Sequence, residues 1–176
     1  AVVQEASPAL AADRQKDVAR AVGMGAVKYA DLSQNPQSLV VFSWEKAMAL
    51  NGNSAPYLQY AYARIRSVQD KFTERFPSVD PAAYPIRLTE KPERALAVKV
   101  AGFADAVMLS ASGFKPSALA DYLYDLAGKY SSFYQNVPFL KADEGVRESR
   151  IRLCGVTAAI LRKGLSLLGI ETMDRI

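Results

Sequence analysis

Apolar side chains recur at intervals of three and four residues along most of this chain, the spacing of one face of an α-helix. The clearest stripe follows Ser54 and Pro56, which suit the cap and the first turn of a helix. Its members are Leu58, Ala61, Ile65, Val68 and Phe72. The pattern predicts a helix from Pro56 to about Phe76 that ends before Pro77.

Three further stripes predict helices in the second half of the chain. The first runs from a cap at Thr89 to about Gly113, the second from Lys115-Pro-Ser117 to a stop at Pro138, and the third ends at Gly169. Their apolar members are Leu96, Val100, Phe103 and Val107; Leu119, Tyr122, Leu123, Leu126, Tyr130 and Phe133; and Ile151, Cys154, Ala158, Leu161, Leu165 and Leu168. Four long amphipathic helices with short links predict an all-α fold, a helical bundle.

The first 50 residues carry shorter patterns. They predict a polar helix over residues 8–22 that stops at Gly23, as a C-terminal glycine, and a second short helix that stops at Asn35-Pro36. The run SLVVFSW predicts an extended segment, and EKAMAL predicts one or two helical turns. These elements lead into the loop Asn51-Gly-Asn-Ser54, which has the composition of a turn.

Tyr57, Tyr60 and Arg64 form a second stripe on the helix that starts at Pro56. This stripe lies roughly a quarter-turn from the apolar one, at the border of core and solvent. Two rings and a guanidinium in that place can stack on exposed nucleic-acid bases. Tyrosines there can equally bury their rings and leave their hydroxyls in water, and the residues alone leave both interpretations open.

Tyr134 lies near the end of the helix predicted from residue 116, beside two amides and the break at Val137-Pro138. An aromatic ring next to amides is suited to stack a splayed base and to read its edge. The alternative is that this ring packs on a neighbouring helix. The last helix is basic, and its charges make either a solvated face or a phosphate-tracking surface: Arg147, Arg150, Arg152, Arg162 and Lys163.

Composition limits the class of protein. The chain has 176 residues, 50% hydrophobic and 23% charged, which suits one domain with a short preceding segment. No uninterrupted run of about 18 apolar residues and no secretory signal is found, so we expect no membrane association and a cytoplasmic location. The single cysteine, Cys154, fits a buried thiol, and the net charge of +4 suits an anionic partner. A first residue other than methionine suggests a fragment or a processed product.

Catalytic chemistry has little support in these residues. The chain has no histidine, which excludes nucleophilic mechanisms that use an imidazole base and also the usual tetrahedral zinc sites. No GxxxxGK loop is present, and Gly23-Met-Gly25 lacks the third glycine of a dinucleotide site. We therefore expect no catalytic residue, no metal and no cofactor in this chain.

The run VFSWEKAMALNGNSAPYLQYAYARIRS resembles the junction in arginyl-tRNA synthetases where the catalytic domain passes into the all-helical, DALR-type anticodon-binding domain. Further blocks similar to the same family stand in the family's order: AVGMGAVKYADLSQN upstream of this run, then YLYDLAGKYSSFYQNVPFL and RLCGVTAAILRKGLSLLGIETMDRI downstream. The resemblance covers about Val22 to Ile176. This sequence departs from it at Tyr62 and Gln135, where the family often has histidine, so no imidazole role is carried over to them.

The resemblance implies a division into residues 1–50, the tail of the catalytic domain with linker helices, and residues 51–176, the anticodon-binding domain. The parent would be a bacterial-type arginine–tRNA ligase that uses ATP to attach arginine to its tRNA. Signatures of the HIGH and KMSKS kinds are absent from these residues. We therefore expect the fragment to bind the anticodon arm of tRNA without catalysis, with ATP and arginine bound by the rest of the synthetase chain.

The resemblance also implies which positions contact tRNA: Asn51, Asn53, Ser54, Tyr57, Tyr60, Arg64, Tyr134 and Ile176. Ile176 stands at the end of the chain, where the family usually has a methionine that folds back near the anticodon. A rival hypothesis from another class is a helical protein-interaction or assembly domain, in which the tyrosine stripe docks a partner helix.

Overall fold

The computed structural model describes residues 12–35, 37 and 39–176, and within these ranges it contains helices and no strand. The predicted all-α fold is therefore confirmed. In chain order the elements are α2 (Ala12–Leu32), α3 (Trp44–Ala47), α4 (Ala55–Arg75), the 3-10 turn η1 (Pro81–Ala83), α5 (Lys91–Ala101), α6 (Phe103–Ser112), α7 (Pro116–Asn136) and α8 (Val146–Leu167).

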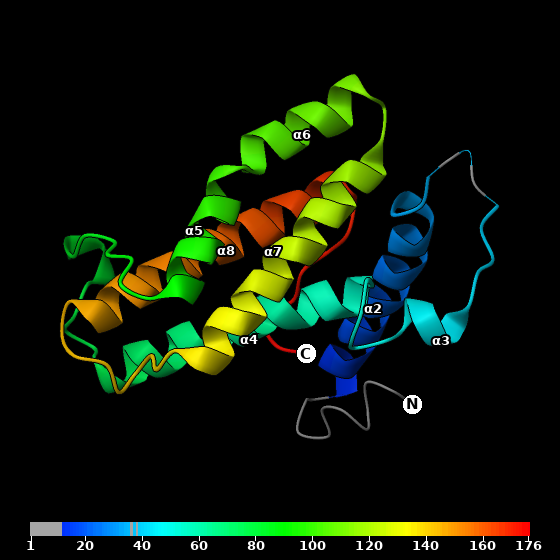
Figure 1. The fold of residues 1–176 in the computed structure, drawn as a ribbon. Helices are drawn as coiled ribbons and strands as arrows, with labels where there is room; N and C mark the ends of the chain where they lie inside the picture. The colour runs from blue at the N-terminus through cyan, green and yellow to red at the C-terminus, as the bar shows by residue number, and fades with distance from the viewer. Residues whose placement is uncertain (1–11, 36, 38) are drawn as a thin grey trace.

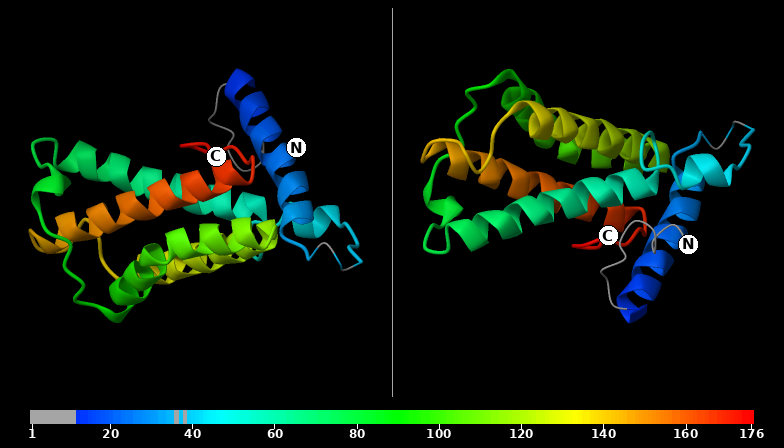
Figure 2. Two further views of the ribbon diagram at one scale, coloured as in Figure 1. Left: turned by 90° about the horizontal axis from the view of Figure 1, so that it is seen from above. Right: turned by 90° about the horizontal axis from the view of Figure 1, so that it is seen from below.

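The long helices α4, α7 and α8 pack together as a bundle, and α5 and α6 cover the outer side of α7 (Figure 1). Helix α2 packs on α4 and crosses it steeply near the N-terminal end of α4 (Figure 2). Every apolar residue predicted on the stripes of α4, α7 and α8 is buried, with 8% exposure or less. The core is therefore the meeting of those three predicted faces.

Helix α4 begins as the sequence predicts. The Ser54 hydroxyl accepts a hydrogen bond from the backbone N–H of Tyr57 at 3.3 Å, and Pro56 occupies the first turn. The helix ends at Arg75, before Pro77. This start orients the first tyrosine of the stripe.

Helix α2 corrects the prediction of two short helices separated at Gly23, since it runs unbroken from Ala12 to Leu32. A glycine inside a helix costs about 1 kcal/mol of stability relative to alanine. The burial of the apolar face of α2 outweighs that cost here. The apolar face of α2 is buried: Val18, Ala21, Val22, Ala26 and Tyr29. Gly25 serves the same packing, because a Cβ there would lie only 3.0 Å from the Gln59 side chain of α4. The predicted start at Pro8 and the stop at Pro36 lie outside the described residues.

The helix predicted from Thr89 to Gly113 is also different, because a turn at Gly102 divides it into α5 and α6. In an unbroken helix the Lys99 carbonyl would accept a hydrogen bond from the N–H of Phe103. Here it accepts from the Tyr122 hydroxyl at 2.6 Å and from the N–H of Gly102 at 3.1 Å. A side chain inserted into the ladder is a known cause of kinks. The N-cap is Glu90, and Thr89 lies one position earlier.

The stretch Lys91–Ser112 is long and apolar enough, by length and composition alone, to cross a membrane, with a hydropathy of 1.5. The turn at Gly102 lies in its middle, and both of its halves pack along α7. Leu96 is fully buried in the core, whereas Met108 and Leu109 of α6 are 66% and 65% exposed. In this structure the stretch is part of the helical bundle.

The buried stripe of α8 gives a stability prediction. Leu161 has 0% exposure, so Leu161→Ala removes apolar contacts and leaves a cavity. We expect a loss of about 2 to 5 kcal/mol in the free energy of unfolding, measured by denaturant melts. Leu167→Ala is the matched control, because Leu167 lies on the same helix with 49% exposure. A loss below about 0.5 kcal/mol for Leu161→Ala would contradict its place in the core.

Candidate nucleic-acid interface

Tyr60 and Arg64 of α4 and Tyr134 of α7 form one cluster, named here the Tyr–Arg cluster. The guanidinium carbon of Arg64 lies 4.7 Å from the centre of the Tyr60 ring and 5.3 Å from that of Tyr134. These distances are within cation–π range. Tyr60 is 40% exposed and Tyr134 38% exposed, so both rings keep surface open to solvent. The cluster therefore brings two aromatic rings and one cation together from two helices.

Buried rings support Tyr134 from behind. Its ring centre lies 6.1 Å from that of Tyr130 and 5.8 Å from that of Phe139. Tyr130 has 0% and Phe139 has 9% exposure. Burial also raises the pKa of Tyr130 well above its ordinary value, and its hydroxyl stays protonated. The exposed ring is therefore held by core rings.

A groove lies between the second half of α4 and the end of α7, with a volume of about 650 Å³. That volume is within the range of small-molecule pockets. We call it the α4–α7 groove. It is lined by Arg64, Ser67, Val68, Lys71, Tyr134, Gln135, Asn136, Val137, Pro138, Phe139 and Leu140. Apolar side chains, amides and cations thus meet at one concave surface beside the Tyr–Arg cluster.

Arg150 of α8 holds the loop that forms one side of the groove. One terminal nitrogen of its guanidinium donates to the Pro138 carbonyl at 2.7 Å, and its Nε donates to Oε1 of Glu93 at 2.6 Å. Both ionised side chains are buried, with 7% and 1% exposure. The other carboxylate oxygen of Glu93 accepts from the N–H groups of Thr89 and Glu90. Arg150 therefore links the groove loop to the start of α5.

The pKa of Glu93 reflects these contacts. Burial by itself raises the pKa of this carboxyl, but the hydrogen bonds from the Glu90 backbone and from Arg150 favour the ionised form more strongly. The net result is a pKa below the ordinary value of 4.5. The buried pair is therefore charged at neutral pH.

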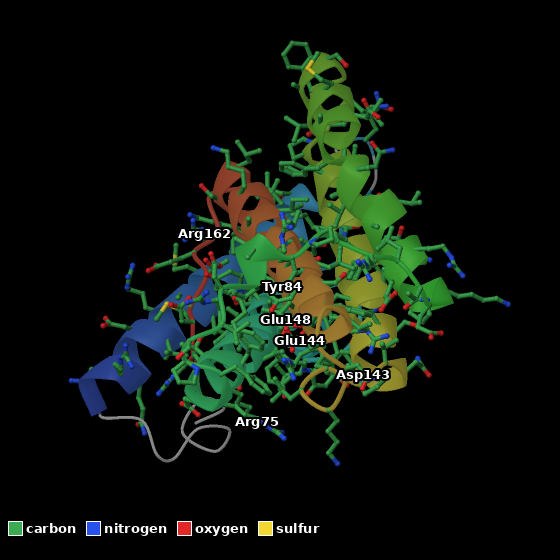
Figure 3. The ribbon with its side chains drawn as sticks, turned by 90° about the vertical axis from the view of Figure 1, so that its left-hand side faces the viewer. Arg75, Tyr84, Asp143, Glu144, Glu148 and Arg162 are labelled. Carbon is green, nitrogen blue, oxygen red and sulfur yellow. The ribbon has the colours of Figure 1, made fainter. Side chains whose placement is uncertain are left out.

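The start of α8 is anchored in a similar way. The Glu148 carboxylate accepts from the Gly145 N–H at 2.6 Å and pairs with Arg147, whose guanidinium carbon lies 3.9 Å from the centre of the Phe76 ring. Figure 3 shows Glu148 and Glu144 beside Tyr84, whose hydroxyl donates to Glu144 at 2.8 Å.

The basic residues of the last helix therefore divide into two groups. Arg147 and Arg150 have structural partners, and Arg152 donates to the Tyr84 carbonyl. Their contacts differ from the solvated face that the sequence pattern permits, because these side chains reach other segments of the fold. Arg162 and Lys163 remain exposed.

The sequence-predicted residues before the cluster lie at the N-terminal end of α4. Tyr57 is half-buried and packs edge-on against Tyr124, with ring centres 5.7 Å apart. Asn53 is exposed, and its Oδ1 accepts from the Tyr29 hydroxyl at 2.6 Å. Ser54 has 2% exposure, and its hydroxyl donates to the Ala49 carbonyl while it caps the helix.

Among these residues, Asn51 and Asn53 are exposed next to a turn in which Gly52 has a φ of +94°. The Ser54 hydroxyl is used in two hydrogen bonds to the backbone, one as donor and one as acceptor. Its contribution in this structure is to fix the start of α4, on which Tyr57 and Tyr60 are placed.

Ile176 ends a tail that follows a different face of α4. The Asp174 carboxylate accepts from the Tyr62 hydroxyl at 3.0 Å and pairs with Arg66, and Arg175 pairs with Asp70. Residues 62, 66 and 70 lie on the side of α4 roughly a third of a turn from residues 60 and 64. In the described part of the chain, no hydrogen bond or ion pair links Ile176 to Tyr60, Arg64 or Tyr134.

Sequence reasoning missed part of the groove. Ser67 and Lys71 follow Arg64 at offsets of three and seven, so helical periodicity alone places them on its face. Phe139 and Leu140 come from a loop after a proline, and no periodic signal places them there. Arg150 looked like an ordinary surface charge on a basic helix, and its burial depends on the partner supplied by α5.

The fold and the groove define a helical domain with a concave surface of aromatic rings, amides and cations. Residues 58–176 match the family model described as the DALR anticodon binding domain, and the chain belongs to that family.

The individual proteins that this chain is similar to are consistent with membership of this family. Over 175 residues the chain is 43% identical to a protein of Vibrio campbellii named arginine–tRNA ligase, covering 99% of this chain and 30% of that protein. It is 44% identical over 174 residues to the protein of that name from Mannheimia succiniciproducens, with the same coverage. The structure resembles Thermus thermophilus arginyl-tRNA synthetase with a TM-score of 0.88 and 30% identity, over 99% of this chain and 30% of the other. The chain thus spans about a third of the length of these relatives.

The buried ion pair gives a pH-dependent prediction. Arg150→Met leaves Glu93 without its cation, and we expect a loss of about 3 to 5 kcal/mol in the free energy of unfolding at pH 7. Because the pKa of Glu93 is lowered in the folded state, its contribution to stability is present above the ordinary value of 4.5 and lost as pH falls through the lowered pKa. Denaturant melts from pH 7 to acid should therefore show a smaller fall for the variant than for the wild type.

Arg162→Met is the control for this measurement, because Arg162 lies exposed on the same helix. Its free energy of unfolding should stay within about 0.5 kcal/mol of the wild type. Equal stability of Arg150→Met and Arg162→Met, with the same pH dependence, would show that the pair does not hold the fold.

Proposed function

We propose that this chain is the anticodon-arm-binding part of a bacterial-type arginine–tRNA ligase. The Tyr–Arg cluster is the observation that carries the proposal: a cation lies between two half-exposed rings at the edge of a groove. Such a surface recognises unstacked bases, because every base has a π face and RNA loops present bases that are free to leave their stack.

The parent enzyme would attach arginine to tRNA, as the names of the relatives indicate, and would use ATP for this reaction. Its ATP and arginine sites would lie in the rest of the synthetase chain. Within the present chain, residues 1–50 would be the tail of the catalytic domain with linker helices, and residues 51–176 the anticodon-binding domain. The buried free thiol of Cys154 suits a reducing cytoplasm.

The site residues contribute in different ways under this proposal. Tyr60 and Tyr134 stack on bases, and the Arg64 N–H groups reach a base edge or a phosphate while its plane stays on the rings. Asn51, Asn53 and Tyr57 extend the surface along the N-terminal end of α4. Ile176 contributes at the edge of this RNA-binding surface, through the C-terminal tail that follows α4.

Two exposed amides of the groove, Gln135 and Asn136, support base reading. An amide offers two donors and an acceptor, so it can distinguish Watson–Crick edges. The Asn136 amide nitrogen already donates to the Ser132 carbonyl at 2.8 Å, which leaves Gln135 as the freer of the two among the described residues.

Tyr134 gives the test of this function. If its ring stacks an anticodon base, Tyr134→Ala weakens binding of the arginine tRNA by about 1 to 3 kcal/mol in titrations at one fixed salt concentration. Tyr134→Phe keeps most of the affinity if stacking dominates, and loses much of it if the hydroxyl reads a base edge. Denaturant melts on the same samples give the folded fraction.

Phe114→Ala is the matched control, because Phe114 is an 89% exposed aromatic at the other end of α7. It should leave tRNA affinity unchanged. The proposal fails if wild-type protein does not bind the tRNA, as a helix-docking protein would not. Unchanged affinity per folded molecule of Tyr134→Ala would remove this ring from the site.

A further inference from the structure

Three polar residues of α4 line the α4–α7 groove in a row. Arg64, Ser67 and Lys71 are spaced by three and four positions, so they share one face of the helix. The row extends about 10 Å along the helix axis. Arg64 lies at the end with the tyrosines, and Lys71 lies at the other end with Ser67 between them. The residues across the groove, 134–140, begin with the ring of Tyr134.

The charged side chains that line this groove are all positive. Its lining contains two cations, Arg64 and Lys71, and no carboxylate. Across residues 12–35 and 39–176, neither cation forms an ion pair. The neighbouring arginine on the other side of α4, Arg66, pairs with Asp174. A concave surface with one sign of charge attracts an anion, so the groove favours a negatively charged group at its Lys71 end.

The two cations suit different parts of a nucleotide. The plane of Arg64 is occupied by the Tyr60 and Tyr134 rings. Lys71 is exposed and has no partner in the described chain, and its ammonium is a compact charge on a flexible stem that suits phosphate. Ser67 is exposed one turn away and can donate its hydroxyl to a phosphate oxygen.

We propose that Lys71 and Ser67 bind the backbone phosphate of the RNA nucleotide whose base stacks on Tyr134. This inference rests on the proposed function and extends it. The ring fixes the plane of the base, and the ammonium and the hydroxyl fix the position of the chain next to it. The contact is independent of sequence, so it sets the register in which the bases are presented to the cluster and to Gln135.

The salt dependence of binding tests this contact. Each phosphate neutralised by a lysine adds about one to the magnitude of the slope of log K against log salt. Lys71→Gln should therefore weaken binding of all tRNAs alike and lower the magnitude of the slope by about one. Lys71→Arg should keep the slope, and Ser67→Ala should weaken binding several-fold with the slope unchanged.

Lys115→Gln is the matched control. It removes the same charge from an exposed position at the start of α7 that does not line the groove. Its slope should equal that of the wild type. Because both lysines are exposed, the unfolding midpoints of the two variants should match that of the wild type.

Anticodon arms that carry one neutral methylphosphonate at a time locate the phosphate. On the wild type, one position should lose affinity most, and that same change should have little effect on Lys71→Gln, because the contact is already absent. If the wild type does not bind the arm, the proposed function fails. If it binds, and Lys71→Gln keeps the wild-type slope and the wild-type response to every methylphosphonate, only the present inference is overturned.

Discussion

The buried contact between Arg150 and Glu93 is the constraint on which the candidate site depends. Taking two charges out of water is costly unless both are fully hydrogen-bonded, and here the carboxylate accepts from Arg150 and from the start of α5. One terminal nitrogen of the guanidinium donates to the Pro138 carbonyl. A loop that follows α7 is thereby held at one position relative to two other helices. The groove beside Tyr134 keeps its shape for the same reason.

Helix α4 has three distinct faces, and each carries a different task. The first is apolar and fills the core, with Leu58 and Ile65 fully buried. The second, which includes Tyr62, binds the C-terminal tail through Asp174. The third carries Tyr60 and the cations of the α4–α7 groove, whose lining contains no carboxylate. Because the first two faces fix the helix in place, the third can remain open to solvent as a preorganised surface.

The sequence predicted most of the fold because its helices depend on local signals. The predicted stripe and end agree with the structure for α4, α7 and α8, and the predicted Ser54 cap agrees for α4. The break at Gly102 instead depends on the Tyr122 hydroxyl, which comes from a distant part of the chain. The predicted helix end at Gly23 was wrong because packing between helices outweighs the local preference of glycine for a helix end. The site followed the same rule: periodicity placed Tyr60 beside Arg64, but the loop that completes the groove has no periodic signal.

The central claim, that RNA binds at the α4–α7 groove, is tested most directly by an NMR titration of the isotope-labelled chain with the anticodon arm of the arginine tRNA. The account predicts the largest shift changes at Tyr60, Arg64 and Tyr134, with the signals of Met108 and Leu109 on α6 unchanged. An arm that binds while the cluster signals stay unperturbed, or that perturbs α6 instead, would contradict it.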